Sequence, residues 1–172
     1  MKKGFTMIEL IFVIVILGIL ASVAIPRLAA TREDAEISAA LSNLRTLVSD
    51  ANAYYLAKGS FAGTNWRDFT NVPLQTGTDV PIHSTKFVGD VVFLGVSGKN
   101  CIKVQIVNAM GARPAYFIFG KDNVHSLKGA CKKVADADLV KAYLDSTVSY
   151  TNGNKPVNVS NAMAIGSSTS IY

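Results

Sequence analysis

The sequence contains few of the residues from which catalytic and metal sites are usually built. It has two histidines, His83 and His125, and two cysteines among 172 residues. Neither histidine stands at a ligand-like spacing from the other, from a cysteine or from paired carboxylates. The sequence also lacks a nucleophile elbow and a GxxxxGK phosphate-binding pattern. We therefore expect no metal, no cofactor and no enzymatic activity, with both histidines in structural or solvent-exposed positions.

The chain has no strong excess of charge of either sign. Its 17 lysines and arginines face 12 aspartates and glutamates, a net charge of +5 that is spread along the sequence. The densest cationic cluster is only Lys128, Lys132 and Lys133. Three lysines usually form a solvated surface, so the sequence does not favour nucleic acid as a partner, and contact with DNA or an acidic surface is the alternative.

One long hydrophobic run is present, at the start of the chain. FTMIELIFVIVILGILASVAI extends from Phe5 to Ile25 and is interrupted by charge only at Glu9. A helix of this length rises roughly 30 Å, the thickness of the hydrocarbon core of a bilayer. The small-residue cleavage site of an ordinary secretory signal is absent where it would be needed. The run therefore predicts a membrane-spanning helix, and basic residues on both sides leave its orientation open.

Glu9 is the unusual residue of this run. A carboxylate within an apolar helix costs several kcal/mol unless it is paired, so such residues usually have a partner or a function. Because Glu9 is close to one end, its side chain can also simply reach the lipid headgroups. The residue alone does not decide between these two interpretations.

The first thirty residues resemble the type IV prepilins and type II secretion pseudopilins. The segment KKGFTMIELIFVIVILGILASVAIP has a short basic leader ending in Gly4, followed by Phe5 and Thr6. Glu9 occupies the fifth place after the expected cleavage point, and the apolar run ends at Pro26. This pattern is dense and specific, so the sequence is identified as a member of that class.

The resemblance implies a maturation and assembly route. A prepilin peptidase would cut between Gly4 and Phe5, and the new amine of Phe5 would be N-methylated. Glu9 would then pair with the Phe5 amine of a neighbouring subunit, because a carboxylate and an ammonium lower their joint cost when they meet in a low-dielectric filament core. Implied partners are other pilin-like subunits, the peptidase, the membrane and an inner-membrane assembly platform.

The same resemblance implies a domain organisation and a location. Residues 1–4 would be the removed leader. Residues 5–57 would form the N-terminal helix, with 5–25 as membrane span and later filament core, and residues 58–172 the globular head. We expect the subunit in the bacterial inner membrane with its head in the periplasm, and then in a pilus or pseudopilus. We also expect a helix kink at Pro26.

Beyond the kink the sequence predicts an amphipathic helix followed by a small sheet. Gly59 is a suitable helix stop. The strand-like runs are KFVGDVVFLGV, CIKVQIVNA and AYFIFG, with a short helical turn expected at 66–69 and a helix in ADADLVKAYLDS. We expect the tail from Thr151 to be irregular, with a possible last strand.

The fold class is α+β and pilin-like, a long N-terminal helix packed on a small antiparallel sheet. The apolar stripe of the helix comprises Ile37, Leu41, Leu44, Val48, Ala51 and Tyr55.

The two cysteines, Cys101 and Cys131, fall in the predicted head. An even pair in an exported domain more often forms a disulfide than stays free. Such a bond would stabilise the fold by roughly 3 to 4 kcal/mol on the chain-entropy model.

Three aspartates, Asp136, Asp138 and Asp145, are candidate calcium ligands, since some secretion pseudopilins bind that ion. They fall in the predicted helix and lack the DxDxDG pattern, which favours a solvated helix face.

The leading hypothesis for function is a structural subunit of a type IV pilus, and the alternative within the same class is a type II secretion pseudopilin. The disulfide-capable head favours the pilus. Two further alternatives are an anchored periplasmic enzyme or binding module and a simple single-pass membrane protein. No sequence feature supports the first, and the second predicts that Glu9 is dispensable.

Overall fold

The computed structural model describes residues 6–75, 81–82, 91–122 and 129–166. Its chain divides into two compact units, Met1–Ala35 and Glu36–Tyr172, which are treated separately below. The predictions made at Gly4, Phe5, His83, His125 and Lys128 lie outside the described residues.

The first element is a single helix, α1, which spans Met7–Lys58. It ends where Gly59 takes a left-handed conformation with φ of +74°. The Gly59 amide donates to the carbonyl of Tyr55 at 2.7 Å. Glycine adopts this conformation at little steric cost, so the predicted stop at Gly59 is confirmed.

Pro26 lies inside α1. Proline has no amide hydrogen, so the helical bond to the carbonyl of Ser22 cannot form. In the same turn, the hydroxyl of Ser22 donates to the carbonyl of Ile19 at 2.7 Å. The backbone is helical on both sides of this position, and the kink at Pro26 stays a prediction.

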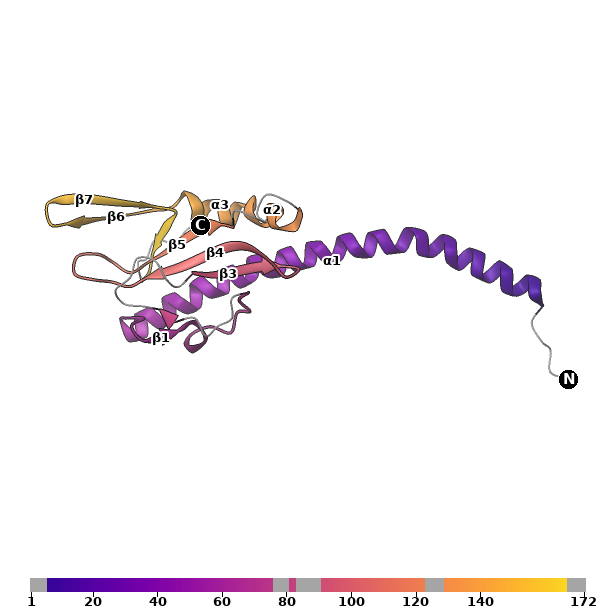
Figure 1. The fold of residues 1–172 in the computed structure, drawn as a ribbon, viewed down its shortest axis with the longest axis horizontal. Helices are drawn as coiled ribbons and strands as arrows, with labels where there is room; N and C mark the ends of the chain where they lie inside the picture. Colours follow the sequence, from indigo (N-terminus) through magenta and orange to yellow (C-terminus); the bar gives the residue numbers. More distant parts are fainter. Residues whose placement is uncertain (1–5, 76–80, 83–90, 123–128, 167–172) are drawn as a thin grey trace. The chain divides into compact units, whose positions relative to one another are not determined.

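The second unit is built around a four-stranded antiparallel sheet with strand order β3-β4-β5-β8 (Figure 1). The first three strands correspond to the three predicted runs, and β8 is the last strand of the chain that the structure describes. The strands are β3 at Val91–Val96, β4 at Lys99–Val107, β5 at Tyr116–Lys121 and β8 at Ala162–Ala164.

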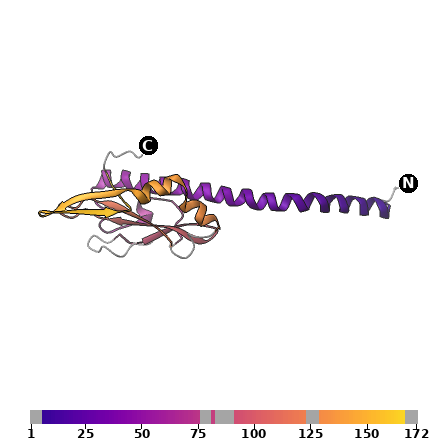
Figure 2. The same cartoon turned by 90° about the horizontal axis from the view of Figure 1, so that it is seen from above.

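The main core lies between one face of this sheet and the part of α1 that belongs to the second unit (Figure 2). Leu44 and Leu47 of α1 are buried in the same cluster as Val92 of β3 and Val104 of β4. Helical spacing brings the leucines to one side of α1, and strand alternation brings the valines to one side of the sheet. The predicted fold class, a pilin-like α+β arrangement, is confirmed.

Two short helices follow β5 in the sequence, α2 at Gly129–Ala135 and α3 at Asp138–Asp145. The helix predicted in ADADLVKAYLDS is α3, whereas α2 was not predicted. The Tyr143 ring of α3 stacks on Phe119 of β5 with ring centroids 4.8 Å apart. The predicted disulfide is confirmed, because Cys101 of β4 is bonded to Cys131 of α2.

The tail is more ordered than the sequence predicted. A hairpin forms from β6, Thr147–Asn152, and β7, Lys155–Ser160, where an irregular segment was expected from Thr151 onward. Its inner residues, among them Val148 and Val159, cover Tyr116 on the sheet face opposite α1. The possible last strand of the prediction agrees with β8, whereas the hairpin was not predicted, because polar residues dominate its strands and its apolar contacts are made to a distant part of the chain.

The connection after α1 contains a two-stranded pair, β1 at Thr64–Asn65 and β2 at Pro81–Ile82. Between them a 3-10 turn, η1 at Trp66–Asp68, confirms the predicted helical turn. Trp66 is fully buried in the main core.

Candidate assembly surface

The first unit presents a long exposed apolar surface. Ile8 is 75% exposed, Phe12 65% and Ile25 65%. The large apolar side chains from Met7 to Leu28 are exposed in the same way. A contiguous apolar surface of this extent marks contact with lipid or with another protein. By length and composition, α1 is the one helix among the described residues that could cross a membrane.

Glu9 interrupts this surface near the start of α1, where its carboxylate is bound by Thr6. The Thr6 amide donates to Glu9 Oε2 at 2.8 Å, and the Thr6 hydroxyl donates to the same oxygen at 2.7 Å. In return the Glu9 amide donates to the Thr6 hydroxyl at 3.3 Å. This reciprocal arrangement is a capping box, which satisfies amides that the first helical turn leaves without partners.

The capping box gives Glu9 a role that the sequence analysis missed, although the T-x-x-E spacing is its known signature. The capping box also leaves the carboxylate with capacity for further hydrogen bonds. Both bonds from Thr6 end on Oε2, and a carboxylate can accept about four hydrogen bonds over its two oxygens. Glu9 is exposed. It can therefore accept a further cationic donor while the cap stays formed.

The charged residues considered in the head do not converge on one site. Lys132 and Asp136 form an exposed ion pair at 2.7 Å. The hydrogen bond from Lys132 lowers the pKa of Asp136, and the same bond raises the pKa of Lys132. Asp138 and Asp145 lie at the two ends of α3. Among the described residues no group of three potential metal ligands occurs.

Four further predicted site residues, two cysteines, Glu9 and Pro26, lie in the part of the chain that the structure describes. Cys101 and Cys131 are joined, with Cα atoms 5.0 Å apart. Glu9 and Pro26 are both in α1, within the first unit. Cleavage and methylation at Gly4 and Phe5 stay predictions.

Comparison with known proteins supports the resemblance found in the first residues. Residues 1–25 match the family described as the prokaryotic N-terminal methylation motif. Over 158 residues the chain is 30% identical to a fimbrial protein of Neisseria meningitidis serogroup B, which covers 90% of this chain and 88% of that protein. No solved structure matches the chain.

Other relatives are secretion proteins that match over a shorter length. The chain is 38% identical over 63 residues to a type II secretion system core protein G of Pectobacterium carotovorum, covering 37% of this chain and 40% of that protein. For the protein of the same name from Escherichia coli, the identity is 36% over 64 residues, with coverage of 37% and 44%. The chain thus spans less than half the length of these secretion relatives.

The chain belongs to the family of type IV pilins and type II secretion pseudopilins. It is a pilin-like structural subunit, and this family assembles filaments from such subunits. Its apolar N-terminal helix and prepilin motif fit an anchor that first lies in a membrane.

Proposed function

We propose that this chain is a type IV pilus subunit that is cut between Gly4 and Phe5 by a prepilin peptidase and N-methylated at Phe5. Residues 5–25 hold it in the bacterial inner membrane, with the head (58–172) in the periplasm. An inner-membrane assembly platform then moves it into the filament, where Glu9 pairs with the Phe5 amine of a neighbour. No catalytic activity is part of this role.

The observation that carries the proposal is Glu9 on an exposed apolar helix. A carboxylate among apolar side chains is expensive in lipid and in a packed filament unless a cation compensates it. The cap from Thr6 supplies hydrogen bonds but no opposite charge. A new N-terminal ammonium supplies that charge and fixes the axial register of the two subunits.

A pilus is favoured over a secretion pseudopilus by the extent of the similarity. The fimbrial relative aligns over 88% of its length and includes the head, whereas the core protein G from Pectobacterium aligns over 40%. The disulfide in the head agrees with this choice. Deleting the chain should therefore remove surface filaments and leave the secretion of folded proteins intact.

The test of assembly uses Glu9→Gln, because glutamine also completes a capping box and removes only the charge. The variant should insert into the membrane and be processed like the wild type. Losing one partner of a desolvated ion pair should lower the yield of sheared filaments roughly tenfold or more. Thr6→Ala is the matched control, which weakens the cap and keeps the carboxylate, so it should assemble better than Glu9→Gln. Normal filament yield from Glu9→Gln would show that Glu9 serves the cap alone.

A further inference from the structure

The β6–β7 hairpin has two backbone edges, which differ in what they offer to another strand. Among the described residues, β6 and β7 form a two-stranded sheet with each other (Figure 1). Asn152 and Lys155 face each other across a two-residue turn, so they exchange both of their backbone hydrogen bonds. In an antiparallel pair the backbone groups of successive residues point to opposite edges. The pairs of the hairpin therefore alternate between groups that are bonded inside it and groups that face outward.

Three residues of each strand direct their N–H and C=O groups away from the partner strand. The register places them in three facing pairs, Thr147 with Ser160, Ser149 with Asn158 and Thr151 with Pro156. All six are exposed. Within the described part of the chain, neither set of outward groups bonds to a further strand.

Two outer edges of the head are covered or blocked. On β3, at one end of the larger sheet, the Phe93 carbonyl accepts a hydrogen bond from the Gln75 amide at 2.8 Å. On β7, Pro156 has no N–H to offer, and its ring occupies the place from which a donor would reach a neighbour. Lys155 adds a charge beside it. Proline and lysine are residues with which natural sheets prevent edge-to-edge pairing.

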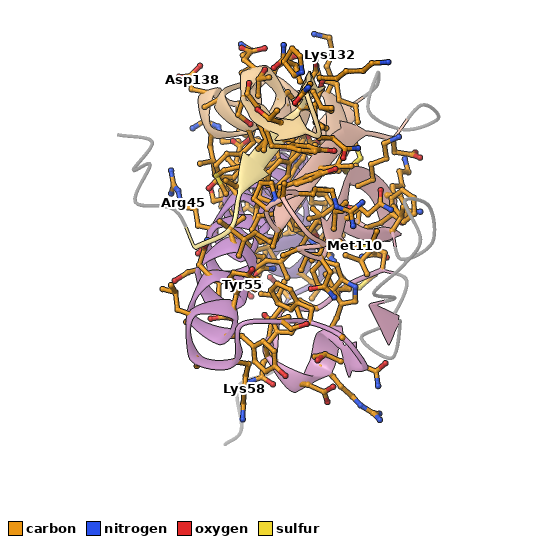
Figure 3. All side chains as sticks on the ribbon, turned by 90° about the vertical axis from the view of Figure 1, so that its left-hand side faces the viewer. Arg45, Tyr55, Lys58, Met110, Lys132 and Asp138 are labelled. Atoms are coloured by element: carbon orange, nitrogen blue, oxygen red, sulfur yellow. A yellow bond between two sulfur atoms is a disulfide. The ribbon has the colours of Figure 1, made fainter. Side chains whose placement is uncertain are left out.

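The outer edge of β6 has no such protection. Thr147, Ser149 and Thr151 each present one donor and one acceptor, and β6 contains no proline and no charged residue. The charged side chains at the surface of α2 and α3, among them Lys132 and Asp138, belong to other elements (Figure 3). The hairpin therefore has one blocked edge and one edge that is open to a further strand.

From this difference we infer that the open edge of β6 pairs with the same edge of a second copy, which belongs to a neighbouring filament. The inference rests on the proposed function, because it requires filaments. In an antiparallel arrangement centred on Ser149, Thr147 of each copy faces Thr151 of the other, and about six backbone hydrogen bonds form. Facing serine and threonine side chains stabilise such a pair, and no like charges meet.

The contact closes after two copies. Both copies use the same edge, and the β7 edges on the outside of the joined sheet are blocked. The contact therefore links filaments sideways and takes no part in the growth of one filament. A pair of this size is too small to hold two free subunits together. Filaments carry many copies, and repeated weak contacts add up between two of them.

Proline substitution on the two edges tests the inference directly. Ser149 and Asn158 lie opposite each other, and the hairpin uses the amide of neither. Ser149→Pro removes the central donor of the open edge, so it should lower the share of filaments found in lateral bundles about fivefold or more. Asn158→Pro makes the same change on the blocked edge, and its bundling should stay within about twofold of wild type. Electron micrographs of sheared filaments at matched concentration give both values.

A second pair of variants avoids any effect of proline on folding. Ser149→Lys places two like charges at the centre of the contact, whereas Asn158→Lys places the same charge on the other edge. Only Ser149→Lys should lower bundling about fivefold, and added salt should restore part of the loss. Equal effects of the two lysine variants, or wild-type filaments that stay single, would overturn the inference and leave the proposed function intact. Absence of wild-type filaments would instead refute the proposed function, and the inference with it.

Discussion

At the scale of single residues, Tyr116 places a hydroxyl group in the interior of the head. Its side chain is fully buried beneath the β6–β7 hairpin, where its hydroxyl interacts with Tyr150 but makes no well-aligned hydrogen bond among the described residues. The ring lies beside Tyr150 with centroids 6.5 Å apart. Burial raises the pKa of Tyr116, because the charged form would lose its hydration.

The pKa of Tyr116 leads to a prediction about alkaline stability. A tyrosine whose pKa is raised on folding keeps its proton in the folded state while the unfolded chain loses it, so stability falls as pH rises above about 10. Tyr143 contributes in the same direction, because burial raises its pKa as well.

Tyr116→Phe should weaken this alkaline loss without removing it, since Tyr143 remains. At neutral pH the free energy of unfolding should be unchanged or higher by up to about 1 kcal/mol, because a buried hydroxyl without a well-aligned hydrogen bond is deleted. Denaturant unfolding at pH 7 and at several pH values above 10 measures both effects. A clear loss of stability at pH 7 would mean that the hydroxyl has a partner.

At the scale of elements, α1 has an apolar surface along its first half and an amphipathic pattern in the part that belongs to the head. Leu47 is fully buried against the sheet, whereas Leu56 in the last turns of the same helix is 72% exposed. The two leucines share a helix and a chemistry, and differ only in environment.

Leu47→Ala should therefore lower the free energy of unfolding of the head by about 2 to 5 kcal/mol, through lost burial and the cavity left behind. Leu56→Ala should change it by no more than about 0.5 kcal/mol. Denaturant titration of the detergent-solubilised chain compares the two variants. Similar losses for both would contradict the packing of α1 on the sheet.

Elements with strong local patterns were predictable from the sequence. The apolar run, the stripe containing Leu44 and Val48, and the stop at Gly59 each follow from composition or spacing. The strands β3, β4 and β5 were visible as runs of β-branched and aromatic residues. The disulfide followed from the number of cysteines and the expected compartment.

Elements held only by distant contacts were not predictable. The β6–β7 hairpin is polar on its outer side and depends on contact with Tyr116, which lies far away in the sequence. α2 is one of the shortest helices described, Gly129–Ala135, and the disulfide to β4 fixes its position. In the candidate site, Glu9 was recognisable by its charge within the apolar run, whereas its bond with Thr6 was not predicted, although the T-x-x-E spacing indicates it.

At the scale of the whole molecule, an apolar surface and a folded head belong to one chain. The exposed apolar surface from Met7 to Leu28 is of the kind that lipid or another protein covers, and the proposed function assigns it to lipid before assembly and to other subunits afterwards. The head has its own hydrophobic core and a disulfide. In the proposed route, processing at Gly4 would link the membrane and the filament, because it would create the cation that pairs with Glu9.

The most direct test of this account is the intact mass of the mature chain extracted from membranes or filaments. The account predicts a single mass that corresponds to a chain beginning at N-methylated Phe5, with Cys101 and Cys131 oxidised. A chain that retains Met1 to Gly4, or one cut beyond the apolar run, would contradict prepilin processing. Glu9 would then lack its cationic partner, and the proposed mode of assembly would fail.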